Sequence, residues 1–295
     1  MELQQMRYVV AVAETANFTR AAERCLVVQS ALSHQIARLE RELGARLFDR
    51  TSRRVRLTPA GEAFLPAARQ ALEAAERARA EAAAAVGEVR GPLVIGAIPT
   101  VAAVDLPALL RDYRPRHPGV RVRLRVGGSE ELVEQVRQGG MDVAFLGLPL
   151  GSRPKGVRVR ELARGDLAAV ASPDHWLSGR AEVELREIAD ETFVDFSAGT
   201  AGRAQSDQAF AAAGLTREVA FEVTAPDFIT RLVRMGLGIS LLPAAFVPEV
   251  PGVVAVPIRD APARVEYLVW SRFRPAPPAA ALLAALGVGP EDGAA

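Results

Sequence analysis

Residues 18–61 read FTRAAERCLVVQSALSHQIARLERELGARLFDRTSRRVRLTPAG and carry the strongest pattern in the chain. Four apolar side chains recur at i, i+4, i+7 and i+11, which predicts a helix with one buried face: Leu32, Ile36, Leu39 and Leu43. Gly44 follows as the expected C-cap, and Asn17 precedes a shorter helix over 19–24 as its expected N-cap. Two short helices joined by about three residues make a helix-turn-helix.

A wing and a long helix are expected next. Residues 46–57 alternate around a polar, basic tip, which predicts a two-stranded hairpin. Thr58-Pro59 is a strong helix start, and the helix predicted over 58–88 is a rod of roughly 45 Å at 1.5 Å per residue. Its apolar positions keep a seven-residue rhythm, so the expected partner is a second copy of the helix; the alternative is a solvated linker. These positions are Leu65, Ala68, Leu72, Ala75, Ala82, Val86 and Val89.

The sequence pattern changes after Arg90-Gly91-Pro92, where predicted strands and helices begin to alternate. The order strand, helix, strand, helix, strand over 93–146 predicts a parallel, doubly wound α/β sheet. A second set of strands and helices follows, and a late strand at 266–270 with a helix at 279–286 returns to the first lobe. The cleft between two such lobes is where small ligands tend to bind. The expected domains are 1–58, a linker helix at 59–90, and 91–295 with lobe I at about 91–161 and 266–295 and lobe II at about 162–265.

Charge is distributed unevenly along the 295 residues. The whole chain has 36 basic and 35 acidic residues, a net charge of +1, which argues against a surface that is basic throughout. Residues 1–60 alone carry ten Arg and six acids, whereas the remaining residues have a net charge of −3. The sequence therefore predicts a basic N-terminal part, suited to binding nucleic acid, followed by an acidic remainder.

The face of the 29–43 helix opposite its apolar stripe carries short hydrogen-bonding groups beside cations. Ser30 and His34 point directly outward, with Ser33 and Arg38 beside them. Such a face suits the major groove, where small polar groups meet base edges and Arg reaches phosphates. Taken alone, this helix is better explained by a solvated face, but the basic wing that follows favours DNA.

The first sixty residues closely resemble the N-terminal domain of LysR-type transcriptional regulators, in FTRAAER, QSALSHQIARLE, ELGARLFDR and VRLTPAG. Gly91-Pro92-Leu93 and the run GLGISLLP at 236–243 extend the resemblance over the chain. The family implies a winged helix-turn-helix, a linker helix that dimerises, and a two-lobed effector domain like a periplasmic binding protein, often in a tetramer. It also implies phosphate contacts from Thr19 and the wing, and base contacts from the 29–34 segment. The expected DNA-binding residues are Thr19, Arg20, Gln29, Ser30, Ser33, His34, Arg38, Arg50, Arg53 and Arg54.

Two positions depart from the family pattern. Val28 stands where a Ser commonly caps the recognition helix, so that cap, which contributes about 1 kcal/mol, must come from elsewhere. His34 stands where Arg is common, which puts the usual bidentate guanine contact in doubt.

Ligand contacts in the effector domain are expected from loops at the strand ends of both lobes. Thr100 and Ser129 each precede a predicted helix, whose free N–H groups and dipole favour an anion; plain helix capping is the alternative. Arg203 is the basic residue expected to pair with an anionic effector, with an external salt bridge as the alternative. The expected effector-binding residues are Pro99, Thr100, Val101, Ser129, Leu148, Thr200, Arg203 and Phe228.

The function expected from these features is a cytoplasmic DNA-binding regulator that responds to a small-molecule co-inducer. Its expected partners are double-stranded DNA, the effector, further copies of the chain in a dimer or tetramer, and RNA polymerase, with no membrane, cofactor or metal. An enzyme is disfavoured because the three His are scattered and neither a phosphate loop nor a nucleophile elbow is present. A ligand-binding module without specific DNA recognition is the other alternative. Cys25, the single cysteine, is expected to be a small core residue rather than a redox sensor.

Overall fold

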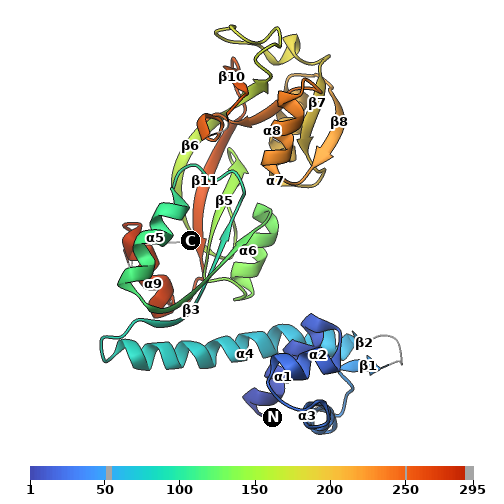
Figure 1. Cartoon of the computed structure of the whole chain (residues 1–295), viewed down its shortest axis with the longest axis vertical. Helices are drawn as coiled ribbons and strands as arrows, with labels where there is room; N and C mark the ends of the chain where they lie inside the picture. Colours follow the sequence, from blue (N-terminus) through green and yellow to red (C-terminus); the bar gives the residue numbers. More distant parts are fainter. Residues whose placement is uncertain (51–54, 250, 290–295) are drawn as a thin grey trace. The chain divides into compact units, whose positions relative to one another are not determined.

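The computed structural model describes residues 1–50, 55–249 and 251–289 (Figure 1). The chain divides into two compact units: Met1–Gly91 with Gln138–Gly140, and Pro92–Arg137 with Met141–Ala295. We call them the first and the second unit. Within the described residues, no helix is both long enough and apolar enough to cross a membrane.

The first unit begins with the expected helix-turn-helix. Asn17 Oδ1 accepts a hydrogen bond from the Arg20 amide at 3.0 Å, and Gly44 ends the third helix at φ +68°, so both predicted caps are confirmed. The predicted burial of Leu43 is wrong: its side chain is 39% exposed, because the helix ends there and the chain turns away. The elements are α1 (Leu3–Thr15), α2 (Phe18–Arg24), α3 (Gln29–Leu43), β1 (Phe48–Arg50) and β2 (Val55–Leu57), and the two strands pair antiparallel.

The long helix α4 (Pro59–Ala84) completes this unit. Thr58 caps it, its hydroxyl accepting from the Gly61 amide at 3.0 Å. The helix stops four residues before the predicted end, because Gly87 adopts φ +84° and the Glu88 amide turns back to the Ala83 carbonyl. Its 26 residues make a rod of about 39 Å, shorter than expected but still far longer than the other helices.

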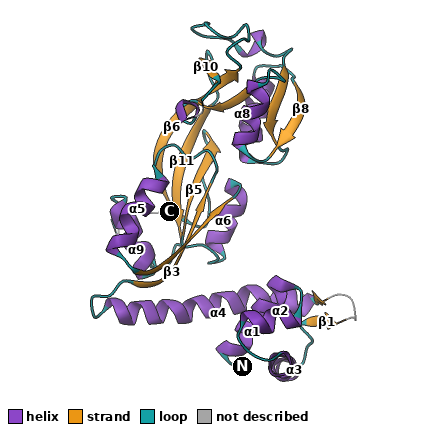
Figure 2. Cartoon of the chain, in the orientation of Figure 1, coloured by secondary structure: helices purple, strands orange, loops and turns teal. Residues whose placement is uncertain are grey.

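A seven-stranded sheet organises the second unit (Figure 2). The strand order is β10-β6-β11-β5-β3-β4, with β9 paired to β6. The expected parallel pairing is found between β3 and β5, whereas the returning β11 runs antiparallel to both of its neighbours, so the sheet is mixed. The strands are β3 (Arg90–Ala97), β4 (Gly119–Val126), β5 (Val143–Pro149), β6 (Arg158–Ala171), β9 (Ser240–Pro243), β10 (Val254–Pro257) and β11 (Ala263–Trp270).

Helices cover both faces of the first-lobe part of this sheet. Leu106 of α5 and Leu282 of α9 are buried in the core on one face, and Leu132 of α6 is buried in the core on the other. Burial on two faces explains the continuous buried runs of β5 and β11. These helices are α5 (Leu106–Arg116), α6 (Ser129–Arg137) and α9 (Pro277–Ala285).

The second lobe is joined to the first by β6. Its first part pairs with β11, and its last part, Leu167–Ala171, pairs with β9 and β10. One 14-residue strand therefore runs through the 161–162 boundary expected between the lobes. The further elements of this lobe are the parallel pair β7 (Thr192–Phe196) and β8 (Glu218–Val223), and the helices α7 (Ala201–Ala212) and α8 (Pro226–Arg234).

Candidate functional site

The outer face of α3 carries most of the residues predicted to read DNA. Leu32, Ile36 and Leu39 are fully buried against the helix-turn-helix core. This burial turns the opposite face to solvent, where Gln29, Ser30, His34 and Arg38 are exposed and Ser33 is half-buried; Thr19 and Arg20 of α2 are exposed as well. The structure thus brings one predicted set together on α2 and α3.

The remaining predicted DNA contacts lie in the wing. Arg50 lies in β1, its backbone opposite Val55, while the predicted phosphate contacts Arg53 and Arg54 lie outside the described residues. Val28 occupies the N-cap position of α3 and makes no side-chain bond to the helix. Its side chain is 68% exposed, so the missing cap leaves the entry of α3 open to a partner's acceptor groups.

A cavity of about 560 Å³ lies in the second unit. Four residues predicted to bind the effector are among those that line it: Pro99, Thr100, Ser129 and Thr200. Both lobes contribute, since β3 leads into Pro99 and Thr100 and α7 begins beside Thr200. Its apolar wall includes Ile98, Val126, Leu167, Phe196, Leu241 and Pro243.

The other four predicted effector contacts, Val101, Leu148, Arg203 and Phe228, are not among the described residues that line this cavity. Val101 and Leu148 pack against the apolar core instead, and Phe228 is 47% exposed on α8. Arg203 forms ion pairs of 3.0 Å with both Asp207 and Glu222, the external salt bridge that was the alternative. Its guanidinium therefore meets these carboxylates rather than the cavity.

Three helix N-termini meet at the cavity. Gly128-Ser129 opens α6, Thr200-Ala201-Gly202 opens α7, and Ala225-Pro226-Asp227 opens α8. Amide N–H groups in the first turn of a helix lack carbonyl partners within it and carry partial positive charge. Thr100 does not precede a helix directly, because α5 begins at Leu106 and Asp105 caps it. Of the three helices that begin at the cavity, α7 has no acidic residue in its first turn, whereas α6 carries Glu130 and Glu131 there and α8 carries Asp227.

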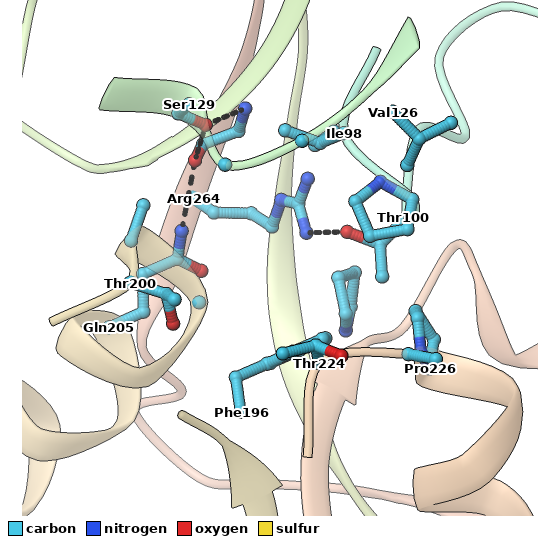
Figure 3. A pocket seen from close by; sticks show the side chains of 18 of the residues that line it. Ile98, Thr100, Val126, Ser129, Phe196, Thr200, Gln205, Thr224, Pro226 and Arg264 are labelled. Carbon is cyan, nitrogen blue, oxygen red and sulfur yellow. Dashed lines mark hydrogen bonds between the residues drawn. The ribbon is translucent and has the colours of Figure 1, made fainter. Parts of the chain in front are cut away.

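Arg264 is the cavity residue that the sequence did not reveal. Its side chain is 5% exposed and lies centrally between the residues of the two lobes (Figure 3). One terminal nitrogen donates to Thr100 Oγ1 at 3.3 Å, and the other donates to Glu266 Oε1 at 3.3 Å. Burial lowers the pKa of Arg264, against the opposing effect of Glu266. The guanidinium is thus buried and held by two long hydrogen bonds.

Fixed polar groups surround this arginine. Glu266 accepts from the amides of Ala102 and Ala103 at 3.1 and 3.0 Å, which ties the loop after β3 to β11. The Ser129 hydroxyl exchanges hydrogen bonds with the Gly147 backbone at 3.0 and 3.1 Å (Figure 3). Among the described residues there is no group of three or more His, Cys, Asp or Glu placed to hold a metal. The arrangement can bind a polar small molecule but offers no acid, base and nucleophile in one place.

Both domains of the chain match models of known protein families. Residues 3–62 match the model of the bacterial regulatory helix-turn-helix protein, lysR family, and residues 87–287 match the LysR substrate binding domain. The chain is 36% identical over 245 residues to the HTH-type transcriptional regulator ShiR of Corynebacterium glutamicum, covering 82% of each protein.

Solved structures of full length extend the likeness to the fold. A full-length OxyR variant from Pseudomonas aeruginosa superposes with a TM-score of 0.74 at 28% identity, covering 96% of this chain and 95% of that one. Full-length CbnR complexed with its target DNA gives a TM-score of 0.70 at 27% identity, covering 97% and 99%. The helix-turn-helix, the two-lobed domain and these relatives together show that this chain is a DNA-binding transcriptional regulator, not an enzyme, and belongs to the LysR family.

Proposed function

We propose that α3 and the wing read an operator while a small molecule in the cavity of the second unit sets the response. The observation that carries this proposal is the pairing of an exposed polar face on α3 with a cavity lined by both lobes. In the proposal, Gln29, Ser30, Ser33 and His34 approach base edges. Thr19, Arg20, Arg38 and the wing residues Arg50, Arg53 and Arg54 hold phosphates.

The proposed assembly is a homo-oligomer in the cytoplasm. In the described chain the apolar seam of α4 is incompletely covered, since Leu65 and Leu72 are only half-buried; Val86, which was predicted to belong to the seam, lies beyond the end of the helix. A second copy of α4 is the partner that this seam fits. Two-fold symmetry then predicts an interrupted inverted repeat in the operator. RNA polymerase is the further partner of the proposal, because a regulator acts on transcription through it.

Two substitutions separate phosphate contacts from base contacts. Arg53→Ala is expected to weaken binding to every DNA sequence and to flatten the salt dependence by about one phosphate contact. Ser33→Ala is expected to change the preference at one base position, at a cost of about 1 to 3 kcal/mol there. Gel shifts with the upstream region and with single-base variants, at two salt concentrations, measure both effects. Equal loss of affinity by both variants on every sequence would contradict the assigned roles.

A further inference from the structure

The cavity contains a buried cation whose hydrogen bonds are incomplete. Arg264 has five N–H donors, yet its two hydrogen bonds to side chains are both 3.3 Å long, compared with about 2.7–2.9 Å for strong ionic hydrogen bonds. Its Nε–H is buried and has no partner among the described residues. A buried donor without a partner is unfavourable, so a ligand that supplies an acceptor to this N–H group is stabilised there.

The carboxylate that accepts a hydrogen bond from Arg264 also accepts hydrogen bonds from the backbone. Glu266 divides its oxygens between the arginine and two backbone amides, those of Ala102 and Ala103. Among the described residues that line the cavity, the one acidic residue is Asp227, which is exposed, whereas Arg264 is 5% exposed. The described cavity is therefore positive in its buried part and negative where it opens to solvent.

Gly147 has no side chain, which leaves space for the guanidinium of Arg264. A Cβ at this position would overlap a terminal nitrogen of Arg264 and come within 2.8 Å of its central carbon and of Ile98 Cδ1. The backbone of β5 is thus shaped around the arginine, and Ser129 braces the same glycine through its hydroxyl. A side chain held this way is preorganised to receive a ligand.

From this geometry we propose that the effector is an organic carboxylate with an apolar body, and that Arg264 holds its carboxylate. The inference rests on the proposed effector role of the cavity and names the chemical class of its ligand. The carboxylate accepts from Nε–H and a neighbouring N–H of Arg264, close to the helix N-termini of α6, α7 and α8. The apolar body lies against the hydrophobic wall, which includes Ile98, Leu167 and Phe196.

A matched pair of fluorescent probes tests the proposal on the full chain. 8-Anilinonaphthalene-1-sulfonate and N-phenyl-1-naphthylamine share one aromatic body, but only the first carries an anionic group. The full chain is expected to bind the sulfonate about tenfold more tightly than the neutral probe, the factor of one ionic hydrogen bond. Phenylacetate is expected to displace the sulfonate, and phenylacetamide at equal concentration is not.

Variants assign the preference to the arginine. Arg264→Gln is expected to reduce sulfonate affinity to that of the neutral probe and to leave the neutral probe unchanged. Arg121→Gln, which removes an exposed arginine from β4, is the matched control and is expected to change neither. Arg264→Lys keeps the charge and is expected to retain part of the preference, which covers the case in which Arg264→Gln does not fold.

Each result contradicts either the carboxylate proposal or the proposed function. The proposal is overturned if the full chain binds both probes alike, if the amide displaces the sulfonate as well as the acid does, or if a folded Arg264→Gln variant keeps the preference. A gel shift on the same preparations reports DNA binding independently. Specific DNA binding without the anion preference removes this inference alone, and the anion preference without DNA binding removes the proposed function alone.

Discussion

Arg217→Ala lowers the free energy of unfolding of the second unit by about 3 to 5 kcal/mol, the loss expected when one partner of a buried ion pair is removed. Arg217 is 3% exposed and pairs with the fully buried Asp195 at 2.6 Å and with Asp207 at 2.8 Å. Its guanidinium also lies 4.9 Å from the ring centre of Phe193 and 5.3 Å from that of Phe210. Without it, Asp195 stays buried with no cation bonded to it.

The pH dependence of that loss follows from Asp195. Burial raises the pKa of Asp195 even in the intact protein, although Arg217 opposes the shift. In the variant the opposition is gone, so the pKa in the folded state rises further above its unfolded value. A raised carboxyl pKa destabilises the fold at high pH, and the penalty shrinks as pH falls through the folded pKa. The variant is therefore expected to lose less stability relative to the parent at pH 5 than at pH 8.

Urea unfolding at the two pH values measures both effects. The double variant Asp195→Leu with Arg217→Met is the matched control, because it replaces both charges with apolar groups and is expected to lose much less stability. A single variant as stable as the parent would contradict the account of this pair, as would a loss that grows on acidification.

Gly61→Ala is expected to lower DNA affinity about tenfold, although alanine normally favours a helix. Gly61 lies in the first turn of α4, and a Cβ there would overlap the carbonyl oxygen of Leu47 at the base of the wing. That carbonyl accepts from the Thr58 amide at 3.0 Å, and Leu57 Cδ2 would be 2.9 Å from the same Cβ. The helix and the wing must move apart, at a cost typical of overpacking, about 1 to 3 kcal/mol.

Anisotropy titration of the upstream DNA measures this loss. Gly165→Ala is the control, because an added Cβ in that part of β6 meets no atom within 4 Å. It is expected to bind DNA as the parent does. A Gly61→Ala variant with unchanged affinity would show that the wing is not held by this close approach.

The helix-turn-helix was predictable because local chemistry determines it. Asn17, Gly44 and Thr58 each act on backbone groups a few residues away, so their roles are visible in the sequence and confirmed in the structure. The buried apolar face of α3 was equally predictable from the sequence, except at Leu43, which is exposed because the helix ends there. Helix α4 ends four residues before the predicted position 88, because the chain turns at Gly87, a glycine in the left-handed region.

The cavity was only half predictable because it depends on contacts far apart in the sequence. Thr100 and Arg264 are 164 positions apart and meet only when β11 returns beside β5. The sequence placed that strand at 266–270, so Arg264 fell in a presumed loop; alternation of Arg264, Val265 and Glu266 was the available signal. The sequence favours Arg203 as an anion contact because it is the only basic residue of the 197–203 loop, but Asp207, one helical turn on, and Glu222 on β8 form ion pairs with it.

The measurement that tests the account most directly is the affinity of the full chain for its own upstream DNA and for a scrambled duplex of equal length, across a salt series. The account predicts that the upstream DNA binds about a thousandfold more tightly at physiological salt. It also predicts that the logarithm of both affinities falls linearly with the logarithm of salt concentration, as the basic residues of the first unit release counterions from phosphates. Equal affinity for the two duplexes at every salt concentration would contradict sequence reading by α3 and the wing.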